Sequence, residues 1–170
     1  MLDEKLVELL NDQVNKEFYS AYLYLSMANY YNEEGLSGFG NWFTIQAQEE
    51  RDHAMLFLEY LQNNGAHVEL KTVEAPKKKF KEFKDPLDES LKHERYVTAS
   101  IHNIYAAASK VKDFRTMQFL DWFVKEQGEE ETNANDLITK MELFGTDAKG
   151  LYMLDAELKA RVYTAPSLTL

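Results

Sequence analysis

Long stretches without glycine or proline constrain this sequence more than any other feature. Residues 1–34 contain neither residue type, and residues 41–64 again contain neither. Three glycines lie between the two stretches, at positions 35, 38 and 40, and Gly65 follows the second stretch. Because glycine and proline are the residues that most often end helices, the pattern predicts two long helices joined by a short turn.

The second half of the chain has a similar arrangement. Asp85 followed by Pro86 is typical of a helix start, with an N-cap and then proline at the first helical position. From residue 87 to residue 144 a single glycine interrupts the sequence, yet this stretch is too long for one globular helix. The polar residues 110–116 therefore predict a turn, with Asp113 as the N-cap of the helix that follows.

Apolar residues in the four predicted helices recur at spacings of three and four. These stripes cover residues 6–28, 42–60, 87–108 and 119–144. Short connections pair the first helix with the second, and the third with the fourth, as antiparallel neighbours. The longer connection, residues 65–85, can run the length of a bundle, since extended chain covers about 3.3 Å per residue and a helix only about 1.5 Å. We therefore predict an all-α four-helix bundle with one long crossover between helices 2 and 3.

A fifth helical segment, about residues 147–160, follows a stop at Gly145. Its apolar stripe consists of Leu151, Leu154 and Leu158. A helix this short is not stable alone. No repeat or linker divides the chain, and we predict one domain over residues 1–170, with the bundle at about residues 3–145.

Composition excludes several classes of function. The chain has no cysteine, which rules out disulfides, thiolate metal sites, iron–sulfur clusters and cysteine nucleophiles. Its 29 acidic and 19 basic residues give a formal charge of −10, which argues against nucleic-acid partners because these need phosphate neutralisation. No window is apolar enough to span a membrane, and the first ten residues do not resemble a secretion signal. We expect a cytoplasmic protein without a membrane partner.

Each apolar stripe contains one glutamate near its middle: Glu17, Glu50, Glu94 and Glu130. Burying an unpaired carboxylate costs several kcal/mol, so four of them at matching depth in one core predict bound cations. For any one of the four taken alone, the alternative is a side chain that reaches solvent or an interface.

His53 follows Glu50 at the i, i+3 spacing, which places both side chains on one helix face. Gln127 and Glu130 have the same spacing in the fourth helix. Carboxylates with one imidazole suit iron, because oxygen donors favour the ferric ion and the nitrogen also accepts the ferrous ion. The Glu-x-x-His pattern alone is weak evidence, since a buried histidine is more often a packing residue than a ligand.

Four segments together resemble the prokaryotic non-haem ferritins, and the resemblance covers essentially the whole chain. They are KEFYSAYLYL with Glu17, QAQEERDH with Glu49, Glu50 and His53, KHERY with Glu94, and WFVKEQGEEE with Glu126, Gln127, Glu129 and Glu130. The resemblance implies an iron-storage protein with ferroxidase activity, which oxidises Fe(II) to Fe(III) with O2 or H2O2. It also implies a homo-oligomeric shell of 24 subunits, in whose cavity hydrous ferric oxide is deposited.

By this resemblance, the ligands of a di-iron centre are Glu17, Glu50, His53, Glu94, Gln127 and Glu130. Glu50 would bridge the two ions, and Tyr24 resembles the redox-active tyrosine of the family, with a plain core tyrosine as the alternative. A third iron site would consist of Glu49, Glu126 and Glu129 together with Glu130. The alternative for residues 129–131 is a solvated charge run, and we keep that interpretation for Glu131.

Differences between this sequence and the related di-iron families narrow the predicted subfamily. A second Glu-x-x-His motif, typical of bacterioferritins and rubrerythrins, is absent. No methionine lies between Glu50 and His53, so we expect no haem. The main alternative function is a soluble di-iron oxidase or peroxidase without iron storage, and a purely structural bundle is a further one. Glu89 and His93 lie off the main stripe and are expected to form a surface pair.

Overall fold

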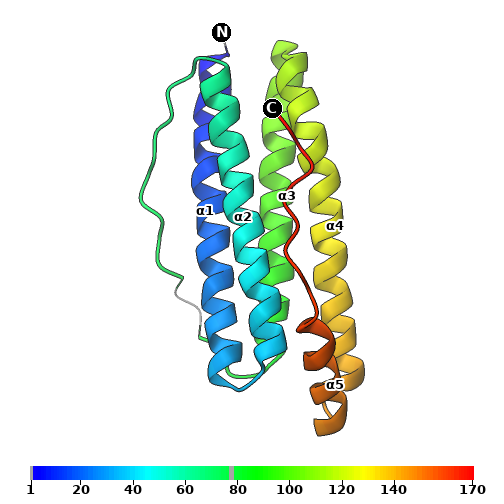
Figure 1. The fold of residues 1–170 in the computed structure, drawn as a ribbon. Helices are drawn as coiled ribbons and strands as arrows, with labels where there is room; N and C mark the ends of the chain where they lie inside the picture. Colours follow the sequence, from blue (N-terminus) through cyan, green and yellow to red (C-terminus); the bar gives the residue numbers. More distant parts are fainter. Residues whose placement is uncertain (1, 77–78) are drawn as a thin grey trace.

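The computed structural model describes residues 2–76 and 79–170, and this part of the chain contains helices and no strand. The helices are α1 (Glu4–Glu33), α2 (Ser37–Asn63), α3 (Asp85–Val111), α4 (Phe114–Phe144) and α5 (Ala148–Leu158) (Figure 1). The predicted all-α class, with four long helices and a short fifth one, is confirmed. None of these five helices combines the length and the apolar character that crossing a membrane requires. That the whole chain forms one domain stays a prediction.

The four long helices form two antiparallel pairs, α1 with α2 and α3 with α4, and α1 also packs against α3. The connection from α2 to α3, apart from residues 77–78, runs along the outer side of α1 (Figure 1). Asn11 fixes this connection to α1, because its side chain donates to the backbone oxygen of His67 at 3.0 Å and accepts from the backbone nitrogen of Glu69 at 2.8 Å. Helices α2 and α3 are therefore parallel, as the length of the crossover predicts.

Of the two N-caps predicted from the sequence, the cap of α4 is confirmed and the cap of α3 is not. Asp113 caps α4, where its carboxylate accepts a hydrogen bond from the backbone nitrogen of Thr116 at 3.1 Å. Asp85 lies inside α3, and its carboxylate accepts from the backbone nitrogens of Lys81 and Glu82 at 2.8 and 3.0 Å. The prediction of Asp85 as an N-cap is wrong, because this side chain closes the turn before the helix.

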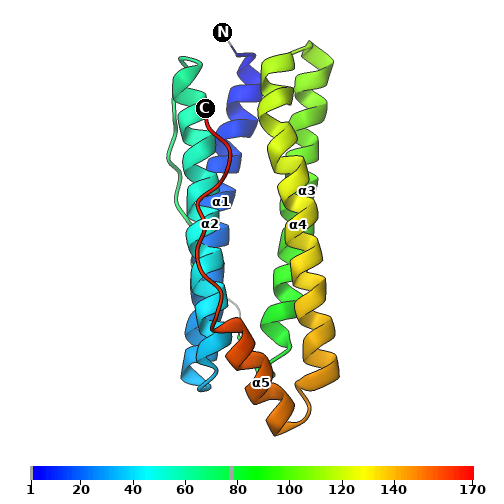
Figure 2. The ribbon, with the colours of Figure 1, turned by 45° about the vertical axis from the view of Figure 1, so that its right-hand side comes forward.

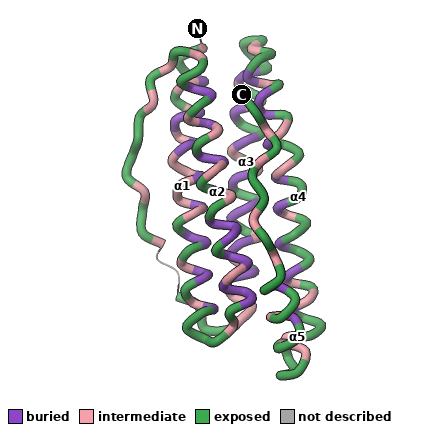
Figure 3. Tube along the Cα trace, in the orientation of Figure 1, coloured by how far each residue is buried: buried purple, intermediate pink, exposed green. Residues whose placement is uncertain are grey.

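Two apolar clusters fill the bundle, and a polar layer lies between them. The cluster nearer α5 contains Tyr31 and Phe39, whose rings stack with centroids 4.8 Å apart. The other cluster contains Phe57 and Phe123, with ring centroids 4.3 Å apart. Buried residues follow the facing sides of the helices (Figure 3). The middle of each long helix therefore contributes to the layer that separates the clusters.

Helix α5 packs across one end of the bundle (Figure 2) and buries Leu154 and Leu158 in the cluster there. Helix α5 also supplies the hydrogen-bond acceptor for the N-terminus of α2, whose N-cap residue, Leu36, makes no side-chain cap. The carboxylate of Asp155 accepts hydrogen bonds from the backbone nitrogens of Gly38 at 2.8 Å and Phe39 at 3.0 Å. Because a helix N-terminus has unpaired N–H groups and a partial positive charge, Asp155 anchors α5 to the bundle.

Residues 159–170, called the C-terminal segment below, turn back from α5 and run along the bundle (Figures 1 and 2). The segment contacts both α2 and α4. The hydroxyl of Tyr163 donates to the Asp52 carboxylate of α2, and the indole nitrogen of Trp122 on α4 donates to the Ser167 hydroxyl at 3.1 Å. On this side of the bundle, the C-terminal segment therefore connects the α1–α2 pair with the α3–α4 pair, although it has no regular secondary structure.

His93 corrects one prediction. Its residue is only 7% exposed, its Nε2 lies 2.8 Å from the hydroxyl oxygen of Ser20, and its ring packs 5.7 Å from that of Tyr19. The expected surface position is wrong for this histidine, because α3 turns it toward α1 where the two helices pack, and its pairing with Glu89 stays a prediction.

Candidate metal centre

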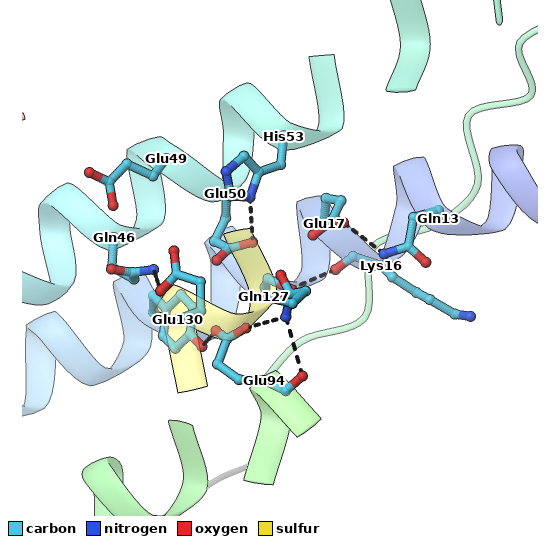
Figure 4. A network of polar contacts seen from close by, with 12 residues as sticks. Gln13, Lys16, Glu17, Gln46, Glu49, Glu50, His53, Glu94, Gln127 and Glu130 are labelled. Carbon is cyan, nitrogen blue, oxygen red and sulfur yellow. Dashed lines mark hydrogen bonds and ion pairs between the residues drawn. The ribbon is translucent and has the colours of Figure 1, made fainter. Parts of the chain in front are cut away.

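Four glutamates, one from each long helix, lie close together in the core of the bundle (Figure 4). They are Glu17 of α1, Glu50 of α2, Glu94 of α3 and Glu130 of α4, and each is at most 5% exposed. The helical period turns each one inward, and the two apolar clusters hold them at the same depth. His53 and Gln127 are buried beside them, so all six residues predicted for a di-iron centre lie in one layer.

Glu17, Glu50 and His53 form the most compact part of this layer. One ligand atom from each lies within 4.8 Å of the others, and Glu50 Oε2 is 3.5 Å from His53 Nδ1. Within the described part of the chain, Glu17 Oε2 and Glu50 Oε1 are buried without a hydrogen-bond partner. Leaving a buried acceptor unpaired costs about 1–3 kcal/mol, and more when it is charged. A cation bound by both oxygens would remove that cost.

Glu94 and Glu130 differ from the first trio because donors already orient their carboxylates. Glu94 accepts hydrogen bonds from the Tyr24 hydroxyl and from Gln127 Nε2, the latter at 3.0 Å. Glu130 accepts from Gln46 Nε2 at 2.7 Å. These contacts hold one carboxylate from α3 and one from α4 toward the centre of the bundle (Figure 4).

Burial raises the pKa of all four glutamates, and loss of hydration is the largest cause in each. The next cause is the charge of Glu50 for the pKa of Glu17, and the charge of Glu94 for the pKa values of Glu50 and Glu130. Hydrogen bonds from its two donors oppose the rise at Glu94. Carboxylates that repel one another in a dry core favour a bound cation, whose binding releases their protons.

Tyr24 belongs both to the apolar core and to the centre. Its ring lies 5.8 Å from that of Phe43 and 6.1 Å from that of His93, while its hydroxyl donates to Glu94. Burial and then the charge of Glu94 raise the pKa of the phenol, so Tyr24 stays protonated and acts as a donor. Its place against a candidate ligand agrees with the predicted position, and its redox role stays a prediction.

The carboxylates predicted for a third iron site are less closely assembled. Glu49 pairs with Arg161, whose Nη2 lies 2.6 Å from Oε2. Glu129 is exposed and 3.4 Å from Lys125 Nζ, while Glu126 is half-buried, with its pKa raised by burial. Over residues 2–76 and 79–170, the trio on α1 and α2 is the single group with three ligand atoms this close together. A third site therefore stays a prediction.

Glu131, which the sequence predicts to be a solvated charge, is partly exposed. Its side chain is 30% exposed and accepts a hydrogen bond from the Thr98 hydroxyl at 2.7 Å. The residue is therefore only partly solvated, because α4 brings it against α3.

Sequence reasoning did not assign three residues that contact the candidate ligands. Gln13 Nε2 donates to Glu17 Oε1 at 2.7 Å, and Gln46 donates to Glu130 as described above. Both glutamines lie on the predicted inward stripes, so the helical period could have found them. Arg161 lies in the C-terminal segment, where no periodic pattern indicated a role.

These observations define a class of protein, the helical bundles in which each long helix contributes a carboxylate to a centre in the core. Comparison with known families then identifies the family. The model of the family described as "Ferritin-like domain" matches residues 7–144. The chain belongs to this ferritin family.

Relatives and solved structures agree with this assignment. The bacterial non-heme ferritin of Campylobacter jejuni is 40% identical over 159 residues, which cover 94% of this chain and 95% of the relative. That of Staphylococcus aureus is 39% identical over 163 residues, covering 96% and 98%. An open-pore ferritin from the hyperthermophilic archaeon Archaeoglobus fulgidus superposes with a TM-score of 0.93 at 44% identity, covering 95% of this chain and all of that one. The predicted ferritin-like fold is thereby confirmed.

Proposed function

We propose that this protein is an iron-storage ferritin whose di-iron centre acts as a ferroxidase. The observation that carries the proposal is the trio of Glu17, Glu50 and His53, with one unpaired buried oxygen on each glutamate. Ferrous iron is the substrate. Two Fe(II) ions give one electron each to O2, which takes up two protons and leaves as H2O2. With H2O2 as the oxidant, two electrons and two protons yield two molecules of water.

The residues divide into two metal positions that share Glu50. Glu17 and His53 complete the first position, and Glu94 and Glu130 complete the second, with Gln127 close by. Carboxylate oxygens stabilise Fe(III) more than Fe(II), which favours the loss of an electron. The raised pKa values mean that iron binding displaces protons from these carboxylates.

Surrounding residues hold the ligands and exclude water. Tyr24 and Gln46 donate to carboxylates of the second position, and Gln13 donates to Glu17 of the first. We include Tyr24 among the catalytic residues because its oxidisable phenol touches Glu94. The family's third iron site is assigned to Glu49, Glu126 and Glu129 with Glu130.

Storage requires a shell, and we propose the 24-subunit assembly and a cytoplasmic location on the basis of the family. Support comes from large apolar side chains that the single chain leaves exposed at the end capped by α5. They are Leu143, Phe144, Tyr152 and Met153, each at least half exposed. Large apolar side chains exposed near one another in the fold are typical of a surface that contacts other subunits.

Mass and iron uptake test the proposal together. We expect a particle near 24 times 19.8 kDa that takes up ferrous iron far beyond three ions per chain. Glu50→Ala and His53→Ala should abolish rapid O2-dependent oxidation and leave the particle assembled. Glu59→Ala, on the exposed side of the same helix, is the matched control and should oxidise iron normally. A small oligomer that saturates at two ions would instead indicate the di-iron oxidase or peroxidase without storage.

A further inference from the structure

The C-terminal segment brings one side chain, that of Arg161, beside the carboxylates of α2. Its Nη2 donates to Oε2 of Glu49 at 2.6 Å, and its Nη1 donates to the backbone oxygen of Trp42 at 3.1 Å and to Oε1 of Gln46 at 3.0 Å. The guanidinium also lies 4.4 Å from the centroid of the Trp42 ring. A single cation thus contacts three residues on one face of α2.

The ion pair of Arg161 and Glu49 is largely buried. The Arg161 side chain is 22% exposed and that of Glu49 is 19% exposed, so screening by water is weaker than for a surface ion pair. Trp42 and Gln46 hold the guanidinium independently of Glu49, which keeps the positive charge in place. A metal ion that used Oε2 of Glu49 as a ligand would have to displace Arg161, and an ion bound through the other carboxylate oxygen would still be repelled by the guanidinium charge.

The position of Arg161 depends on the docking of the whole segment. Tyr163 and Ser167 bind α2 and α4 through Asp52 and Trp122, so two contacts besides Arg161 keep the segment on the bundle. Replacement of Arg161 alone therefore removes its charge without removing these anchors.

We infer that Arg161 is a positioning residue that competes with a metal ion for the Glu49 carboxylate, so that the docked C-terminal segment limits metal binding beyond the di-iron centre. This inference rests on the proposed function, because it concerns a further ion beside the same centre. It assigns a role to a segment that lies outside the four-helix bundle.

Titration of the iron-free protein with Zn2+ tests the inference, since zinc binds nitrogen and oxygen ligands without changing its oxidation state. Calorimetry reports the number of ions per chain and their affinities. Arg161→Gln should bind an additional ion about tenfold more tightly than the wild type, with the tightest ion changed by less than about twofold. Arg161→Lys retains a charge that can pair with Glu49 and should stay close to the wild type. The gain should disappear in the Arg161→Gln, Glu49→Gln double variant.

Lys159→Gln is the matched control, because it removes the same charge from an exposed position of the same segment. Its zinc isotherm should equal that of the wild type. Identical isotherms for the Arg161→Gln and Lys159→Gln variants would overturn the inference. A wild-type protein that binds no tight ion at all would contradict the proposed function instead, so the two failures are distinguishable.

Discussion

The hydroxyl of Tyr24 donates a hydrogen bond to the carboxylate of Glu94 in the middle of the bundle. The contact joins an aromatic side chain of α1, which is 1% exposed, to the inward glutamate of α3. It lowers the pKa of Glu94 against the stronger effect of burial and so favours the ionised form that binds a metal ion. We therefore expect Tyr24 to influence the centre in two ways: through its packing, and through the hydrogen bond that stabilises the ionised form of Glu94.

Tyr24→Phe should slow ferrous oxidation by about tenfold, because Glu94 loses a donor whose hydrogen bond to a charged group is worth roughly 1.5 kcal/mol. Stopped-flow absorbance after mixing with Fe(II) and O2 measures the rate. Tyr31→Phe is the matched control, since its hydroxyl donates to the backbone oxygen of Phe83 away from the centre. Equal rates for the two variants would show that the contact with Glu94 does not matter.

The metal-free protein should lose stability as the pH rises. Burial raises the pKa values of Glu17, Glu50 and Glu130, so the folded chain binds more protons than the unfolded chain from about pH 4.5, the usual glutamate value, upward. The free energy of unfolding therefore falls with increasing pH through this range. Thermal unfolding at pH 5, 6, 7 and 8 measures the trend.

The same pH series measured on the zinc-bound protein serves as the comparison. Saturating Zn2+ neutralises the ionised carboxylates, so the unfolding temperature should no longer fall as the pH rises. Glu50→Gln should show a weaker fall without metal, while Glu59→Gln on the exposed side of α2 should behave as the wild type. A metal-free protein that gains stability steadily from pH 5 to pH 8 would contradict the assignment.

Gly128→Ala should raise the free energy of unfolding by about 0.5–1 kcal/mol, the cost of a glycine inside a helix. Apart from its chain neighbours and the backbone of its own helical turns, a Cβ atom at this position would have no atom within 4 Å, so no steric clash opposes the gain. Gly38→Ala should have the opposite effect on stability, because the added Cβ would clash with the backbone oxygen of Asp155 at 1.7 Å. That variant should lose about 1–3 kcal/mol. Denaturant unfolding of both variants measures the difference.

Asp155→Ala should release α5 from the bundle. The substitution removes the acceptor for the backbone nitrogens of Gly38 and Phe39, which costs about 1 kcal/mol for a helix cap. We expect faster tryptic cleavage after Lys159 and a smaller fraction of assembled particles by size exclusion. Asp136→Ala, at an exposed position of α4, should change neither. Unaltered cleavage in the first variant would mean that apolar contacts alone hold α5.

Much of the fold and of the candidate centre could be predicted because it follows from spacing along single helices. A helix repeats every 3.6 residues, so Glu17 had to face the same side as Leu10 and Tyr24, and all three are buried. The i, i+3 spacing of Glu50 and His53 is equally local, and their side-chain atoms lie 3.5 Å apart. Helix ends that depend on one nearby residue, such as Asp113, were also predictable.

Contacts between distant parts of the chain were not predictable in this way. The acceptor for the start of α2 is Asp155 in α5, and the partner of Glu49 is Arg161 in the C-terminal segment. His93 is buried because α3 packs against α1, although its own spacing suggested the surface. Such contacts depend on how complete helices meet, and they have no periodicity in the sequence.

The sequence by itself determined which faces of the helices turn inward, and therefore that four glutamates meet in one layer. Only the tertiary structure decided which donors hold each carboxylate: Tyr24 for Glu94, Gln46 for Glu130 and Arg161 for Glu49. The physical reason is the range of the interactions. Helical periodicity is a property of neighbouring residues, whereas a hydrogen bond between elements requires that packing bring two separate segments to within about 3 Å.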